Sequence, residues 1–188
     1  MMRAGELLTR GTIWISIVVY AVGAATLAQS RFRSRFAVTP RNESELTSAS
    51  GSASCQVSRL AWTIACLSLI VHAICAFQFY HGWSHQAAYL ETARQTNELV
   101  GLNWGGGLFI NYLVITGWTV DVAWWWLSGL DSYLKRHWLL LIIWHGFLIF
   151  VIFNATVVFK DGLARWLGLL LCLSLVGAWT VIWRRGRW

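Results

Sequence analysis

Five long runs of apolar residues, separated by short polar segments, form the main pattern of this chain. A helix needs roughly 20 mostly apolar residues to cross the hydrocarbon core of a bilayer, and the five runs fall near that length. Strands of a membrane barrel would instead show short segments in which apolar and polar residues alternate. The pattern therefore predicts an all-α, polytopic transmembrane helical bundle with about five spans. We place them at 11–28, 59–80, 104–127, 138–159 and 163–183.

The segments between the runs differ in length and composition. Residues 40–58 are rich in Ser, Thr and Ala, which predicts a disordered linker on the cytoplasmic side. Only residues 160–162 join the fourth and fifth runs, so these two spans are expected to form an antiparallel hairpin. Within 87–100, Arg94 follows Glu91 by three residues and precedes Glu98 by four, which favours a helix. This helix either continues the second span outside the membrane or turns to lie on its surface.

Composition and charge support a membrane protein and indicate its orientation. Of the 188 residues, 57% are hydrophobic and 12% are charged, with a formal net charge of +7. The arginines lie at the ends of apolar runs, which argues against a nucleic-acid-binding face. With the N-terminus outside, ten of the 15 lysines and arginines lie inside, which favours the N-out/C-in topology. The inner set is Arg31, Arg33, Arg35, Arg41, Arg59, Lys135, Arg136, Arg184, Arg185 and Arg187.

The first run also has features of a signal peptide, because basic residues precede it and Thr26, Leu27 and Ala28 resemble a cleavage site. Three arginines (31, 33 and 35) follow directly, and their translocation would oppose the positive-inside rule. We therefore expect an uncleaved first span. Because no organellar targeting feature is visible, the expected location is the bacterial cytoplasmic (inner) membrane.

The chain contains 14 tryptophans, most of them near the ends of the predicted spans. Indole rings prefer the membrane interface, where the ring is half buried and its N–H stays in water. We expect an outer belt of Trp14, Trp83, Trp104 and Trp166, and an inner belt of Trp62, Trp124, Trp125, Trp126, Trp138 and Trp183. The alternative is a tryptophan-lined ligand cavity, to which the deeper Trp118, Trp144 and Trp179 would contribute.

Polar side chains inside the predicted spans are the first candidates for a functional site. At 1.5 Å per residue, Asp121 lies about 9 Å and His145 about 10 Å from the inner ends of their spans. Because their depths match and a carboxylate favours an imidazolium, we expect them to pair across the third and fourth spans. Such a pair is either a structural clamp or a proton relay or cation site. His72 and Asn111 lie about 12 and 10 Å from the outer ends and are expected to form a second polar contact.

Other histidines suggest metal or haem as alternatives. His81 and His85 are four residues apart, so on a helix both would face one side, as in many metal sites. A third ligand would have to come from acidic residues on the same side of the membrane, and Gly82 is expected to weaken the helix between the two. Haem b needs histidines on two helices at comparable depth, whereas His72 and His145 are offset by about 8 Å.

Two further features have ordinary structural explanations. Gly105, Gly106 and Gly107 open the third span, where small residues allow close helix packing. Unwound backbone lining a cavity is the alternative. The four cysteines form no CxxC pair and are expected to be buried, reduced thiols.

The sequence shows neither a soluble domain nor a recognisable catalytic constellation, which favours a non-enzymatic protein. The leading hypothesis is a subunit or accessory component of a membrane assembly, with the lipid bilayer and other membrane subunits as its partners. The second hypothesis is a haem- or metal-binding redox protein that uses His72, His81, His85 or His145. The third is a proton-coupled transporter that uses Asp121 and His145, although the chain lacks the internal repeat found in many transporters.

Overall fold

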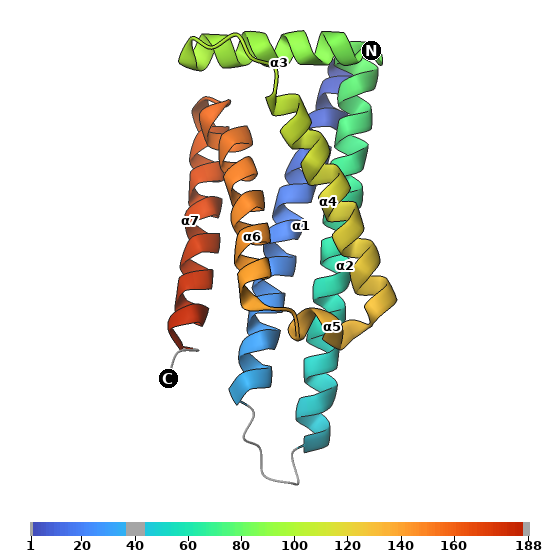
Figure 1. The fold of residues 1–188 in the computed structure, drawn as a ribbon, viewed down its shortest axis with the longest axis vertical. Helices are drawn as coiled ribbons and strands as arrows, with labels where there is room; N and C mark the ends of the chain where they lie inside the picture. The colour runs from blue at the N-terminus through green and yellow to red at the C-terminus, as the bar shows by residue number, and fades with distance from the viewer. Residues whose placement is uncertain (1, 37–43, 186–188) are drawn as a thin grey trace. The chain divides into compact units, whose positions relative to one another are not determined.

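The computed structural model describes residues 2–36 and 44–185, and every regular element in these ranges is helical (Figure 1). This confirms the predicted helical bundle. The elements are α1 (Met2–Phe36), α2 (Ser44–Ala76), the π-helical turn η1 (Phe77–His81), α3 (His85–Val100), α4 (Gly107–Ser128), α5 (Leu130–Leu134), α6 (Trp138–Phe153), the π-helical turn η2 (Asn154–Val158) and α7 (Gly162–Arg185).

Three helical stretches are long and apolar enough to cross a membrane: Ala4–Ser30, Ala53–His81 and Trp138–Val158. They correspond to the first, second and fourth predicted spans. The third predicted span corresponds to α4, which carries Asn111 and Asp121 and is not among these three stretches. The fifth corresponds to α7, whose apolar stretch within the described residues is Gly162–Ala178. The helical, apolar character of the chain is thus supported, whereas the third and fifth crossings stay predictions.

Contacts divide the chain into two compact units, each with its own packing. Unit 1 comprises Met1–Val18 and Ile64–Asp121, and unit 2 comprises Val19–Thr63 and Val122–Trp188. The single membrane domain expected from the sequence stays a prediction.

In unit 1, the first half of α1 packs antiparallel to the second half of α2 through hydrogen bonds to backbone carbonyls. The Ser16 hydroxyl donates to the Ala65 carbonyl at 2.8 Å. The His72 Nδ1–H donates to the Thr9 carbonyl, also at 2.8 Å. Both carbonyls lie inside helices, so these side-chain hydrogen bonds are additional to those of the helical backbone. Polar side chains therefore join the two helices without an orphaned group in an apolar interior.

In unit 2, α1 and α2 approach each other through small residues. A Cβ placed on Gly23 would lie 3.3 Å from the Ala61 Cβ, so the two backbones are close at this point. One turn further, the Ser58 hydroxyl donates to the Thr26 hydroxyl at 2.8 Å. Small residues at a helix interface allow this separation, and hydroxyl contacts then add to the packing.

The prediction of a disordered linker over 40–58 is wrong from Ser44 onward, because α2 begins there. Residues 40–43 lie outside the described residues. Ser54 accepts a hydrogen bond from Ser30 at 3.0 Å, and Cys55 and Ser58 are buried. The Ser- and Thr-rich composition suggested an unfolded segment, but small hydroxyl side chains are also those that pack well between helices. Their composition therefore fits a helix interface as well as a linker.

The helix predicted over 87–100 exists as α3, and it is separate from α2. The chain turns at Gly82 and Trp83, which both have positive φ (52° and 60°). Ser84 then caps α3 by accepting a hydrogen bond from the Ala87 N–H at 3.1 Å. Of the two predicted alternatives, continuation of the second span is thus excluded. In Figure 1, α3 lies across the end of the α2–η1 segment.

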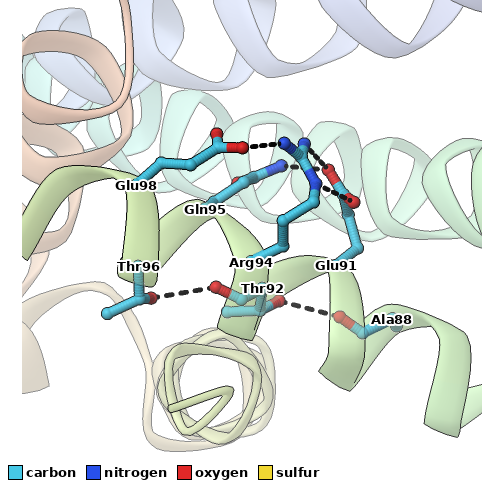
Figure 2. Close-up of polar contacts among 7 residues, drawn as sticks. All are labelled: Ala88, Glu91, Thr92, Arg94, Gln95, Thr96 and Glu98. Carbon is cyan, nitrogen blue, oxygen red and sulfur yellow. Dashed lines mark hydrogen bonds and ion pairs between the residues drawn. The ribbon is translucent and has the colours of Figure 1, made fainter. Parts of the chain in front are cut away.

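The exposed face of α3 carries one arginine, which forms ion pairs with two glutamates along the helix (Figure 2). Arg94 holds both carboxylate oxygens of Glu91, with N···O distances of 2.9 and 2.6 Å, and also binds Glu98. Gln95 donates a further hydrogen bond to Glu91 at 2.9 Å. The hydrogen bonds from Arg94 lower the pKa of Glu91 to about 2, and those from Arg94 to Glu91 and Glu98 raise the pKa of Arg94. The charges of Glu91 and Arg94 therefore persist at neutral pH.

The glycine run fits against α3, whose inward face consists of small residues such as Ala88 and Ala93. A Cβ on Gly105 would collide with the backbone carbonyl of Tyr89, and one on Gly107 would lie 3.2 Å from the Thr92 methyl. The expected close approach is therefore present, although the neighbour is α3 rather than another spanning helix.

The predicted hairpin between the fourth and fifth runs is confirmed, because α6 and its extension η2 pack against α7. Figure 1 shows the two helices side by side, joined by a short turn. Gly162 has a φ of 64° and begins α7 directly after this turn. Gly168 is buried against Thr156 of η2, which fixes the closest approach of the hairpin.

Candidate functional site

Unit 2 contains a buried group of five aromatic side chains, here called the core cluster: Tyr20, Trp62, Trp125, Tyr133 and His145. Each exposes 2% or less of its surface. Each comes from a different helix, in order α1, α2, α4, α5 and α6. The core cluster is therefore where these five segments of unit 2 converge.

Trp62 lies at the centre of the core cluster. Its ring centroid is 5.0 Å from that of His145, 5.4 Å from that of Tyr20 and 6.3 Å from that of Tyr133. Tyr133 in turn stacks on Trp125 at 4.1 Å. These distances are typical of favourable tilted and stacked aromatic pairs. The five rings thus form one continuous packed group.

The polar link in this group joins Tyr20 to His145. The Tyr20 hydroxyl lies 3.2 Å from His145 Nδ1, and the imidazole tautomer decides which of the two donates. A hydrogen bond of this kind removes the cost of burying both polar groups in an apolar interior. The pair holds α1 to α6.

Asp121 is also buried, with 6% of its surface exposed. It belongs to unit 1, whereas His145 belongs to unit 2. The pairing of Asp121 with His145 rests on matched depth in the sequence and stays a prediction.

The two residues of the expected outer contact have different environments. His72 is half buried and donates to the Thr9 carbonyl, which places it between α1 and α2. Asn111 is exposed, one turn into α4. The contact between His72 and Asn111 therefore stays a prediction, while the link from His72 to α1 was not expected.

His81 and His85 do not share a helix, because the chain turns at Gly82, where the sequence predicted a weak point. The metal site at these two histidines stays a prediction. His81 ends η1, and His85 begins α3 after the turn at Gly82. His85 Nδ1 lies 3.0 Å from the Tyr112 hydroxyl, while the His81 ring lies 5.7 Å from that of Phe77. Among the described residues, no three His, Cys, Asp or Glu side chains form a group that could hold a metal ion.

The tryptophan belt is only partly as expected. Trp62 and Trp125 are buried in the core cluster, so their assignment to an inner belt is wrong. Among the described side chains, six tryptophans are exposed, in agreement with a belt: Trp83, Trp104, Trp124, Trp126, Trp138 and Trp166. Trp118 is buried and Trp144 half buried, and the side chains of Trp179 and Trp183 lie outside the described part of the chain.

The four cysteines carry free thiols, as expected. Cys55, Cys66 and Cys172 are buried and Cys75 is half buried, so they act as small packing residues.

The sequence analysis missed Tyr20 and Tyr133. The signal for Tyr20 was present, because its hydroxyl lies inside an apolar run and needs a partner for the same reason as a histidine. Tyr133 had no such signal, since it lies in a polar segment between two runs.

No protein-family model, curated protein or solved structure matches this chain. The functional argument therefore rests on the residues and their contacts.

Proposed function

We propose that this protein is a multi-pass integral membrane protein that serves as a non-enzymatic subunit or accessory component of a larger membrane assembly. The supporting observation is that buried polar side chains form hydrogen bonds between helices. Ser16, Ser58 and Tyr20 each hydrogen-bond to a neighbouring helix. Such contacts hold helices together, whereas a catalytic site would gather several of these groups around one cavity.

The apolar surface also favours an assembly. The most apolar windows of the three long helices are only 39%, 22% and 33% buried. The remaining surface is available to lipid and to the helices of other subunits, because both are equally apolar partners in a bilayer.

For its arrangement we propose five spans in the bacterial inner membrane, with the N-out/C-in orientation that the ten inner lysines and arginines favour. A reporter fused after Trp188 is then expected to be cytoplasmic, and one inserted at Glu91 in α3 external. The two sites are separated by an odd number of spans in this arrangement. Reporters on the same side would show that one of the two crossings outside the three long apolar stretches, α4 or α7, does not span.

Purification from membranes in a mild detergent tests the function itself. We expect the chain to co-purify with stoichiometric membrane proteins and to elute as a complex larger than itself. The matched control is a chain with a charged residue on an exposed apolar face, Leu170→Arg, which is expected to lose partners while its helicity is kept. A monodisperse single-chain species from native membranes would contradict the proposal.

A second candidate, haem or metal binding, is favoured by one observation. The His72 Nδ1–H donates to a backbone carbonyl, as the non-ligating nitrogen of many metal-binding histidines does. The absorbance spectrum and the metal content of the same purified sample test this candidate. A Soret band or stoichiometric metal that is lost in His72→Ala would support it, and a colourless, metal-free sample would exclude it.

A further inference from the structure

The exposed face of α2 carries apolar residues that are spaced alternately three and four positions apart. They are here called the α2 seam: Val57, Leu60, Ile64, Leu67, Val71 and Ile74. Each exposes between 45% and 56% of its surface, and the last four belong to unit 1. A seven-residue repeat with two apolar positions is the pattern by which helices pack along their length as a left-handed pair.

The residue types in the α2 seam also alternate. The first position of each repeat is β-branched (Val57, Ile64 and Val71), and the second is leucine in the first two repeats (Leu60 and Leu67). In coiled coils this combination favours two parallel strands. The exposed residues with the same spacing on α7 are mostly leucine and do not alternate in this way. Contact with lipid requires apolar side chains but no particular order, so the alternation indicates a neighbouring helix.

A hydroxyl beside the α2 seam indicates the same kind of neighbour. Ser68 is half buried near the middle of the apolar stretch Ala53–His81, and it forms no hydrogen bond within the described part of the chain. By contrast, the hydroxyls of Ser16 and Thr63 each donate to a backbone carbonyl. A hydroxyl in hydrocarbon is stabilised by donating to an adjacent helix, and Ser68 lies at the edge of the seam, where such a helix would pack.

The α2 seam is long and wide enough for a stable pair of helices. From Val57 to Ile74 it extends over about 26 Å, most of the roughly 30 Å hydrocarbon core. At roughly 160 Å² for each aliphatic residue of an extended chain, the six half-exposed residues present about 480 Å². Two such surfaces bury about 1,000 Å² together, which is near the lower limit for a specific protein interface. The apolar window of this helix is also the least buried of the three long helices.

We propose that the α2 seam packs against the same surface of a second copy of this chain. Copies of one chain have the same orientation in a bilayer, so the two α2 helices run parallel, which is the arrangement that the residue types favour. Ile64, Leu67 and Val71 then meet the same residues of the second copy around a two-fold axis along the membrane normal. The inference rests on the proposed membrane assembly and identifies one of its partners.

Capture between two tagged copies tests this pair. Full-length chains with two different tags are produced together and extracted in a mild detergent, and one tag is captured while the other is measured. We expect the wild type to carry the second tag into the captured fraction. Val71→Phe places a larger side chain where the two helices are closest, and it is expected to lower the captured amount about tenfold, as overpacking of a close contact does.

The matched control is Val176→Phe. Val176 on α7 exposes 46% of its surface, nearly the same as Val71, and receives the same substitution. The captured amount is expected to stay at the wild-type value in this variant. Circular dichroism of both variants shows whether each keeps its helices.

A cysteine placed in the α2 seam gives a second measurement that does not depend on the folding of Val71→Phe. Leu67→Cys in the otherwise unchanged chain is expected to form a disulfide-linked dimer when membranes are oxidised with copper phenanthroline. Facing positions of a parallel pair bring the two Cα atoms within the roughly 4.4–6.8 Å that a disulfide requires. Leu173→Cys, at an exposed position of α7, is expected to give no more dimer than the wild type.

Two results would overturn the pair. The first is equal capture of the second tag in Val71→Phe and Val176→Phe. The second is equal cross-linking of Leu67→Cys and Leu173→Cys. Either result would mean that lipid or a different subunit covers the α2 seam. Co-purification of other membrane proteins is measured separately, so the pair can fail while the proposed function stands.

Discussion

Replacing Trp62 with alanine is expected to lower the free energy of unfolding of this protein by about 3–5 kcal/mol, the range for truncation of a large buried aromatic side chain. Trp62 exposes 1% of its surface and is the ring that contacts Tyr20, His145 and Tyr133. Its loss would leave a cavity where α1, α2, α5 and α6 meet. In a membrane protein this cost comes mainly from lost packing contacts, because lipid is as apolar as the protein interior.

Denaturation in detergent, followed by circular dichroism, measures this effect. Trp166→Ala is the matched control, since that ring is 64% exposed and removing it creates no cavity. It is expected to change stability by less than about 1 kcal/mol. Equal losses in the two variants would mean that Trp62 is not part of a packed core. Trp62→Phe should retain most of the stability because it refills much of the space.

The centre of this core was only partly predictable from the sequence. His145 was identified because a polar side chain inside an apolar run must find a partner. Trp62 was assigned to the interface from its depth alone, and depth does not say which face of a helix a residue occupies. The run Trp124–Trp126 shows why residues at almost the same depth can have different environments. Consecutive residues on a helix point in directions about 100° apart. Three neighbouring rings cannot all face lipid, and in this case the middle one is buried.

Local signals predicted the elements outside the core more accurately. The spacing of Glu91, Arg94 and Glu98 indicated α3, and the pairs it implied are formed. The three residues at 160–162 indicated the α6–α7 hairpin, because so short a connection allows only antiparallel neighbours. Both inferences depend on interactions between residues close in sequence, which a linear pattern records directly.

Features that depend on partners distant in sequence were not visible in the same way. Composition suggested disorder at Ser54 and Ser58, yet their hydroxyls bond to Ser30 and Thr26 of α1. A serine that packs between helices and one in a flexible linker look identical until the neighbouring helix is known. The same holds for His72, whose acceptor lies 63 residues away.

Replacing Gly168 with alanine is expected to destabilise the protein, although alanine is the better helix former. A Cβ at this position would collide with the side chain of Thr156, so α7 has to move away from η2. Overpacking of a close contact costs roughly 1–3 kcal/mol, which exceeds the helix-propensity gain of about 1 kcal/mol from glycine to alanine.

Gly177 on the same helix provides the matched control. A Cβ there meets nothing within 4 Å, so Gly177→Ala adds helix propensity without a collision. It is expected to leave stability unchanged or to raise it by up to about 1 kcal/mol. The two variants make the same chemical change, but only Gly168→Ala is expected to lower the unfolding midpoint. A rise in both midpoints would show that α7 does not approach η2 closely at Gly168, and the tight hairpin would have to be abandoned.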